Sequence, residues 1–428
     1  MSFFRALRTS LVVCWTAFGA HTALAQTPDN PVRDTTIGRI TLRNAVARVL
    51  DANPKLNGQR FALASADARI GQAALRPAYE LGIEAEDILG TDRLSTFNDS
   101  VITLQLSTVL EFGGKRASRV AAAERERDLM LSELDAEKLD TMAEVARRFI
   151  RLAAAQQQVA MAAQSLDLAG NTSKVVRQRV SAGRGPAAED RNADIALARA
   201  EIETLRANTA VAQAWESLAA MWSGGGSVPA EAVADLFTLP QLQSLAVLED
   251  LLRQNPSLAR FATERRVHEA KLRLAEAAAS TDLTLGAGVR RLVGDRSNAF
   301  VVSLSMPLGA GGRAAPYTAE ARSNLQQVDA REQSARAELA ATLRSFHHDA
   351  ALRAAEIGLL KDKAIPQAES ANTLTRSGFA AGRFSLLELL SSQQQLVEVQ
   401  RAAIEAAVAY HNALIEIERL TAAPATEQ

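Results

Sequence analysis

Residues 102–107 read ITLQLS, a strict alternation of apolar and polar side chains, and three other segments share this pattern. They are residues 81–86 (LGIEAE), 283–290 (LTLGAGVR) and 300–306 (FVVSLSM). Successive side chains of a strand point to opposite faces, so each segment predicts a strand with one apolar and one polar face. Runs of about 8–11 residues are also long enough for a tilted strand to cross a membrane.

The two faces of these strands define two candidate sets of residues. If the apolar side faces lipid, the lipid-facing residues are Leu81, Ile83, Ile102, Leu104, Leu285, Val302 and Leu304. A lumen would then be lined by Glu80, Glu84, Glu86, Thr103, Gln105, Arg290 and Ser303. Rings of carboxylates favour cations, although a merely hydrated polar face would show the same pattern. Turn-rich gaps at 90–99 and 293–298 predict one strand hairpin over 80–110 and a second over 282–307.

Four strands leave two open edges, and no other segment of the sequence reads as a strand. Open strand edges do not occur in lipid, so identical chains would have to complete a barrel. A barrel of eight strands is filled by its own side chains, so a duct needs three or more chains. The alternative is a soluble sheet with one face on a core.

Composition excludes several classes of protein. The 428 residues carry 48 basic and 49 acidic side chains, which leaves no basic footprint for nucleic acid. Hydrophobic residues make up 47% of the chain but aromatic residues only 4%, so alanine, the best helix former, supplies much of the apolar content. Cys14 is the single cysteine, which excludes cysteine metal clusters and disulfide scaffolds.

The N-terminus has the pattern of a secretory signal peptide over residues 1–25. Arg5 and Arg8 precede a short apolar run, and Ala23-Leu24-Ala25 provides an A-x-A cleavage site. The mature chain is therefore expected to work outside the cytoplasm. It contains no run of about 18 apolar residues, so no transmembrane helix is expected.

The mature sequence contains an internal duplication. Asn53-Pro54 recurs as Asn255-Pro256, and two further motifs recur in the same order, all at an offset of about 200 residues. So long a period predicts two copies of a large unit. We expect a first repeat over 26–222, a linker over 223–244, a second repeat over 245–422 and a disordered tail over 423–428.

Each repeat is expected to hold a long helical hairpin, over 112–222 and over 316–420. Residues 112–181 contain no proline, which predicts a helix of about 70 residues, or roughly 105 Å. The returning helix and the preceding helix (about 54–76, and 256–279 in the second repeat) together match that length, so we expect them to stack end to end along it. Pro366 should kink the second long helix.

These features, with the run Leu110-Glu111-Phe112-Gly113-Gly114-Lys115-Arg116, resemble the TolC-type outer-membrane factor family. The Glu-x-Gly-Gly-Lys-Arg motif resembles its heavy-metal, CzcC-like branch. The resemblance implies a mainly α fold with a transmembrane β part, in which four strands per chain join a 12-stranded barrel of a homotrimer. This barrel would lie among the lipids of the outer membrane of a Gram-negative bacterium and continue into a periplasmic α-barrel. A periplasmic adaptor (membrane fusion) protein and an inner-membrane pump of the RND type would be its partners, and heavy-metal cations its cargo.

Two groups of glycine-containing turns are candidate sites. The helix-hairpin turns contain Gly183, Arg184, Gly382, Arg383 and Phe384. The glycines are explained by the left-handed backbone that ends a helix and need no function. The resemblance implies that these hairpin tips face the adaptor and close the periplasmic end of the channel. An exposed Phe384 is expected to need a partner. Strand–helix turns contain Gly113, Gly114, Gly311 and Gly312, where we expect positive φ.

The sequence offers no catalytic, cofactor or metal site. Adjacent helical residues such as His347 and His348 point about 100° apart and chelate poorly. A G-x-G-x-x-A match at 309–314 lacks the βαβ context of a dinucleotide site. The favoured function is a passive efflux channel and not an enzyme, and the alternative is a soluble periplasmic coiled-coil scaffold that binds a partner through its hairpin tips.

Overall fold

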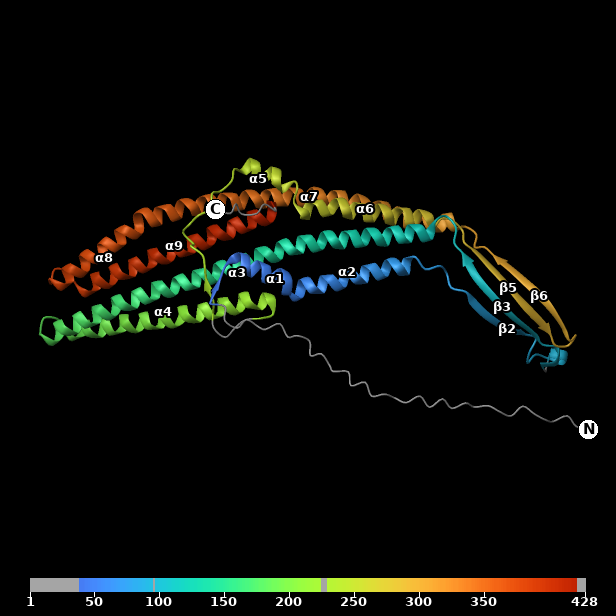
Figure 1. Ribbon diagram of the computed structural model, residues 1–428, viewed down its shortest axis with the longest axis horizontal. Helices are drawn as coiled ribbons and strands as arrows, with labels where there is room; N and C mark the ends of the chain where they lie inside the picture. The colour runs from blue at the N-terminus through green and yellow to red at the C-terminus, as the bar shows by residue number, and fades with distance from the viewer. Residues whose placement is uncertain (1–37, 95–96, 225–228, 422–428) are drawn as a thin grey trace, which may run out of the picture. The chain divides into compact units, whose positions relative to one another are not determined.

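The structure, a computed structural model, describes residues 38–94, 97–224 and 229–421, so the predicted signal peptide and tail lie outside the described residues. Helices and one four-stranded sheet make up most of this part of the chain (Figure 1). Among the helices that the structure describes, none combines the length and apolar character needed to cross a bilayer.

In the part of the chain that the structure describes, four α-helices precede the linker and five follow it. The first four are α1 (Leu42–Ala52), α2 (Pro54–Ala73), α3 (Lys115–Ser181) and α4 (Ala187–Ala219). The others are α5 (Leu245–Leu252), α6 (Pro256–Ala277), α7 (Ala310–Leu359), α8 (Ile365–Ala380) and α9 (Leu386–Thr421). Helix α3 runs for 67 residues, in agreement with the absence of proline from this stretch.

The long helices each pack against two shorter ones. Helices α2 and α4 follow one another along α3, while α6 and α9 follow one another along α7 and α8 (Figure 1). Helix α3 also contacts α6 and α9, which joins the two halves of the chain into one layer. In the half of this layer that is remote from the four-stranded sheet, the order of the helices is α4, α3, α9 and then α7–α8.

A π-helical turn over Leu360–Ala364 interrupts the second long helix and ends two residues before Pro366. Proline has no N–H to donate and its ring clashes with the carbonyl four residues earlier, so the wider turn accommodates it. The predicted start of this helix at residue 316 is wrong. Helix α7 begins at Ala310, and Pro316 lies inside it, because the left-handed Gly309 (φ 80°) already turns the chain into the helix.

The sheet consists of β2 (Glu80–Glu86), β3 (Val101–Leu110), β5 (Leu283–Leu292) and β6 (Ser297–Ser305). Its order is β2-β3-β5-β6 and every neighbouring pair is antiparallel. The central β3–β5 pair joins the two halves of the chain. The two edges of the sheet are therefore β2 and β6.

A second, very small sheet corrects the expectation that no other segment forms a strand. β1 (Arg39–Ile40) pairs in parallel with β4 (Glu231–Ala232), which lies within the predicted linker. The side-chain amide of Gln156 on α3 bonds to the Ala230 oxygen (2.8 Å) and the Ala232 nitrogen (2.9 Å). Two-residue strands have no alternation to detect, so the sequence pattern missed them.

Two asparagines cap equivalent helices in the two halves. The Asn53 side-chain oxygen accepts the N–H of Lys55 (2.9 Å) at the start of α2, and its amide donates to the Met221 oxygen (2.8 Å). Asn255 does the same at the start of α6: its oxygen accepts from the Ser257 N–H (2.6 Å), and its amide donates to the Leu420 oxygen (2.7 Å). Each buried asparagine thus ties the start of a short helix to the end of the returning helical hairpin.

Candidate functional site

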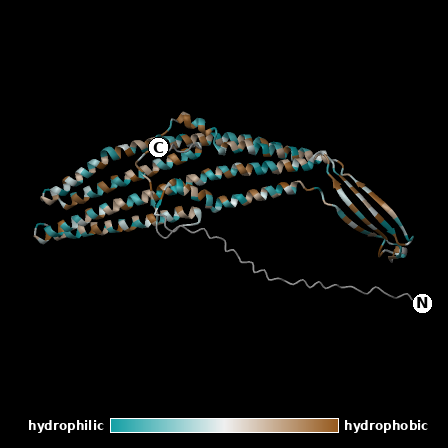
Figure 2. Cartoon of the chain, in the orientation of Figure 1, coloured by the Kyte–Doolittle hydropathy of each residue, from teal (hydrophilic) through white to brown (hydrophobic). Residues whose placement is uncertain are grey.

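The apolar face of the sheet is exposed in the single chain. Strand pairing aligns Ile83, Leu104, Val289 and Phe300 in one row across all four strands, and these side chains are 73%, 47%, 46% and 91% exposed. Figure 2 shows hydrophobic residues alternating with polar ones along the strands. All members of the predicted lipid-facing set are likewise exposed: Leu81, Ile83, Ile102, Leu104, Leu285, Val302 and Leu304. The chain's own helices do not cover them.

The opposite face holds hydrogen-bonded polar side chains. Gln105 on β3 donates to the Ser303 hydroxyl on β6, across β5. Gly286 makes this crossing possible, because a Cβ there would lie 2.1 Å from the Gln105 amide nitrogen. Arg290 donates to the Thr103 hydroxyl (3.0 Å) and lies 3.5 Å from the Glu86 carboxylate. The structure thus places these predicted lumen residues on one face, although Thr103 is buried beneath its neighbours.

Edge strand β2 carries the carboxylates of this polar face. Glu80, Glu84 and Glu86 are exposed, and they occupy alternate positions that pair with Ser107, Thr103 and Val101 of β3. Glu80 and Glu84 form no ion pair with any residue that the structure describes. The polar face therefore has more acidic than basic side chains.

The charges of the Glu-x-Gly-Gly-Lys-Arg motif fix the junction between sheet and helices. Arg119 forms a two-pronged ion pair with Glu111, and hydrogen bonds from this guanidinium lower the pKa of the Glu111 carboxyl. Lys115 reaches Asp282, which precedes β5, at 2.7 Å. The motif thus holds the two halves of the chain together at this point.

Glycines Gly113 and Gly114 both have φ of 71°. A Cβ at Gly113 would lie 2.0 Å from the Ser280 hydroxyl, so a close approach also requires glycine there. The expectation of positive φ at Gly311 and Gly312 is wrong, because both lie inside α7. Gly309 takes the left-handed conformation in their place.

The two helix-hairpin turns have the same geometry. Gly183 (φ 69°) and Gly382 (φ 75°) end α3 and α8, and in each turn the following arginine N–H bonds to the carbonyl five residues earlier (2.8 Å). This is the Schellman arrangement, which satisfies carbonyls at a helix end. The side chains of Arg184 and Arg383 are exposed and form no ion pair within the described residues.

A small apolar cluster joins the ends of the two hairpins. Arg179 of α3 donates to the Phe379 carbonyl oxygen (2.5 Å), and its guanidinium carbon lies 4.4 Å from the centre of the Phe379 ring. The buried side chains around this contact are Val176, Ala193, Phe379, Leu386 and Leu389. Sequence reasoning missed this contact, because nothing in the sequence aligns α3 with α8.

Phe384 packs against its own hairpin turn. Its ring lies against Gly378 of its own hairpin, so closely that a Cβ on Gly378 would be 2.2 Å from a ring carbon. The side chain remains 42% exposed. Packing within the turn thus covers part of the ring, and contact of its exposed part with a partner stays a prediction.

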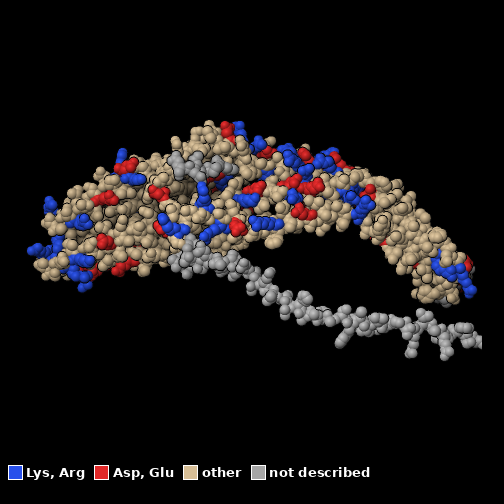
Figure 3. All heavy atoms as spheres, in the orientation of Figure 1, with Lys and Arg blue, Asp and Glu red and all other residues tan. Residues whose placement is uncertain are grey.

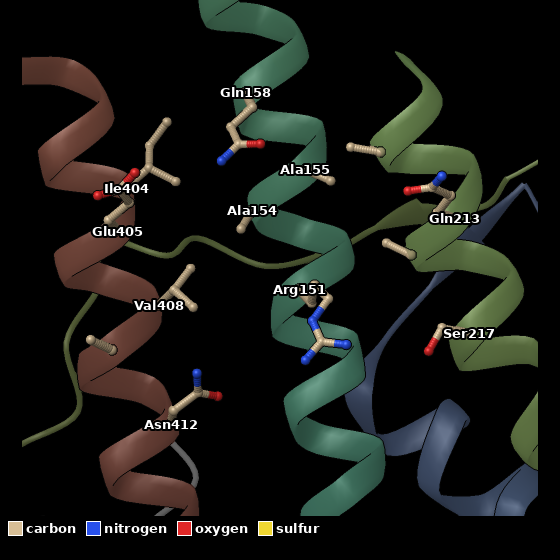
Figure 4. A pocket seen from close by; sticks show the side chains of 13 residues that line it. Arg151, Ala154, Ala155, Gln158, Gln213, Ser217, Ile404, Glu405, Val408 and Asn412 are labelled. Carbon is tan, nitrogen blue, oxygen red and sulfur yellow. The ribbon is translucent and has the colours of Figure 1, made fainter. Parts of the chain in front are cut away.

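A groove of about 550 Å³ lies between α3, α4 and α9 (Figure 4). Alanines form much of its lining, and the charged side chains are Arg151 and Glu405. It contains neither a nucleophile–base pair nor a histidine, so its residues do not form a catalytic constellation. The described part of the chain also holds no cluster of three or more His, Cys, Asp or Glu residues arranged for a metal ion.

Comparison with known proteins identifies the family that shares this architecture. The sequence model of a family described as "Outer membrane efflux protein" matches residues 45–224 and 247–423, most of the chain. The chain belongs to the outer membrane efflux protein family. It is an outer-membrane protein that extends into the periplasm.

Individual relatives agree with this family. The cobalt-zinc-cadmium resistance protein CzcC of Cupriavidus metallidurans is 28% identical over 366 residues, which are 85% of each chain. A membrane protein from Pseudomonas aeruginosa has the same fold, with a TM-score of 0.73 and 18% identity over 89% of this chain and 90% of that one. The outer membrane protein VceC from Vibrio cholerae has a TM-score of 0.71 and 18% identity over 89% and 95%. The efflux proteins of this family are channels and not enzymes.

Proposed function

We propose that the protein is the outer-membrane channel of a tripartite efflux system and conducts its substrate passively from a periplasmic pump and adaptor to the exterior. The observation that carries this proposal is the exposed apolar face of the sheet together with its two open edges. An apolar face of four strands is stable against acyl chains, whereas in water it would be an aggregation site. The outer-membrane family disfavours the alternative of a soluble periplasmic scaffold.

Three copies of the chain would close the barrel. The edges β2 and β6 differ, so β2 of one copy would pair with β6 of the next, a head-to-tail contact that forms a ring. Three copies give twelve strands with no open edge, the number that the family resemblance implies. The carboxylates of β2 would then line a wet lumen.

The helices have matching edges for the same ring. At one edge α4 exposes Ile195, Ile202 and Leu205, which are 52%, 46% and 68% exposed. At the other edge α7 exposes Leu352 and Leu359, which are 59% and 58% exposed. Ile195 and Ile202 on one edge, and Leu352 and Leu359 on the other, are seven residues apart, a spacing typical of helices that pack side by side, so α4 would pack against α7–α8 of the next copy.

We further propose that the two halves of the chain are copies of one unit. Both halves contain a short helix, two strands and a long helical hairpin in that order. The paired roles of Asn53 and Asn255, each capping a helix and bonding to the end of a hairpin, support this duplication.

Divalent heavy-metal cations are the proposed cargo, and 28% identity to a cobalt-zinc-cadmium resistance protein supports this choice. The carboxylates of Glu80 and Glu84 on the polar face would favour the passage of cations, since neither is neutralised by a described basic residue. The hairpin turns with Arg184 and Arg383 are the proposed contact with the adaptor, because they are the exposed ends of the helices opposite the sheet.

Reconstitution of the purified full chain tests the channel. Heat-modifiable trimers from an outer-membrane fraction, which conduct ions in a planar bilayer, are the expected result. A deletion strain complemented with the gene should regain zinc or cobalt tolerance. Recovery of the exported chain as a soluble monomer would contradict the channel and favour the scaffold.

A further inference from the structure

Exposed arginines and aromatic residues gather where the sheet joins the helices. Each of three junctions (α2–β2, β3–α3 and β6–α7, the last two with the first turns of the helix that follows) contributes one exposed arginine that has no described carboxylate partner, and one exposed aromatic side chain. The arginines are Arg76, Arg116 and Arg313. The aromatic residues are Tyr79, Phe112 and Tyr317, which are 75%, 50% and 66% exposed.

This group lies at the helix end of the apolar face. Tyr79 precedes β2 and continues the alternation of Leu81 and Ile83, and Phe112 continues that of Leu110 beyond β3. On the face drawn in Figure 3, the strands form a band with few charges, and basic residues appear at both ends of it. Aromatic residues flanked by basic ones are typical of the boundary between acyl chains and headgroups.

A pocket of about 250 Å³ lies within this group. Its walls come from the start of α3, the 278–282 connection and the first two turns of α7. Lys115 and Asp282 in this pocket neutralise each other at 2.7 Å. Arg313 supplies the remaining positive charge; it donates one N–H to the Leu308 oxygen (2.6 Å), which leaves the other guanidinium donors available.

Other side chains of the pocket suit an amphiphile. Tyr317 lies one turn after Arg313 on the same face of α7 and also lines the pocket. The hydroxyl residues Ser280 and Thr281 form the opposite wall. Leu308, next to the pocket, is 77% exposed. A free phosphate ion would gain nothing from these exposed apolar groups, whereas a phospholipid would cover them.

We propose that this pocket binds the phosphate of an anionic phospholipid in the periplasmic leaflet of the outer membrane. Arg313 holds the phosphate oxygens, and Tyr317 and Leu308 pack against the glycerol and the first methylene groups. The inference rests on the proposed function, because it requires the sheet to lie in the membrane. A bound headgroup at each chain would fix the height of the barrel in the bilayer.

The test measures lipid binding by the full-length protein in detergent, by native mass spectrometry and by thermal stabilisation. Phosphatidylglycerol should bind at least about tenfold more tightly than phosphatidylcholine, because the phosphate of phosphatidylcholine is already neutralised by its own choline cation, whereas that of phosphatidylglycerol gains the full charge-assisted hydrogen bonds to arginine. Arg313→Gln should lose this preference, and Arg313→Lys should retain part of it. Arg199→Gln is the matched control, since Arg199 is exposed on α4 and forms no ion pair within the described chain.

Equal binding of the two lipids by the wild-type protein would overturn the proposal, as would unchanged preference in a folded Arg313→Gln variant. Inorganic phosphate that displaces phosphatidylglycerol at equal concentration would also overturn it, since the site would then be one for a free anion. Failure of the proposed function is distinguishable: the wild-type protein would bind lipid in detergent but would not conduct in a bilayer. A conducting Arg313→Gln channel without lipid preference would support both.

Discussion

Ile83 and Glu84 are adjacent on β2 and test which face of the sheet contacts lipid. Both side chains are exposed in the single chain, and they point to opposite faces. Ile83 lies at the centre of its strand, in a row with Leu104, Val289 and Phe300. Arginine at the middle of a lipid-facing strand costs about 2–4 kcal/mol, a factor of roughly 30 to 700 in the folding equilibrium. Ile83→Arg should therefore destabilise the barrel by this amount in each chain.

Glu84→Arg is the matched control, because it adds the same side chain one residue away on the polar face. It is a better control than a substitution of Thr103, which is buried beneath Arg290. We expect Glu84→Arg to change the free energy of unfolding by less than about 1 kcal/mol, as is usual at exposed positions. The assay is urea unfolding in lipid vesicles, together with the fraction of heat-modifiable trimer on gels. The assignment of faces would be refuted if both variants lost the same free energy of unfolding. It would also be refuted if the Ile83→Arg variant were as stable as the wild-type protein.

Three further predictions concern the helices and their junctions. Gly113→Ala should lower the free energy of unfolding by more than about 1 kcal/mol, because Gly113 has positive φ and a Cβ there would lie 2.0 Å from the Ser280 hydroxyl. Gly311→Ala inside α7 should be neutral or stabilising. Urea titration measures both variants, and equal effects would contradict this reasoning. Arg179→Gln should weaken the contact between α3 and Phe379 by about 1 kcal/mol, because it removes the guanidinium that packs on the ring. Amide hydrogen exchange in α8 should then become faster. Unchanged exchange would argue against this contact. Burial raises the pKa of Glu418 to about 7, from 4.5, so the folded chain retains a proton that the unfolded chain loses. The free energy of unfolding should therefore fall as pH rises from about 4.5 to 7, and Glu418→Gln should remove about 1–2 kcal/mol of this loss. Thermal unfolding of the wild-type protein and of Glu418→Gln across this pH range measures the effect. A difference between them that does not change with pH would contradict the prediction.

The sequence predicted those elements whose pattern is local and long. Strict alternation located all four strands of the sheet, and the absence of proline located the 67-residue α3. Pairing of β3 with β5 was not predictable in the same way, since alternation determines the faces of a strand but not its neighbour. The left-handed glycine of the second junction was misplaced because residues 309–312 contain three glycines, and spacing does not indicate which one turns.

Contacts between distant segments account for the remaining differences. Phe384 packs on Gly378, and Arg179 on Phe379, through the geometry of tight turns and of neighbouring helices. Neither contact has a sequence signal. Residues of the polar face were assigned correctly to one side of the sheet by register, but the burial of Thr103 follows from the long Arg290 side chain on the next strand. Side-chain reach across strands does not appear in a binary pattern.

The pairing of β3 with β5 also constrains the order of biogenesis. These central strands are separated along the chain by α3, α4, α5 and α6, so the sheet cannot be completed while only the first half has been exported. Before that time the protein has a lone two-stranded hairpin, which is marginally stable at best in water. Closure of the proposed barrel would therefore have to wait for the second half of the chain, and the edge of β3 that pairs with β5 would stay open until then.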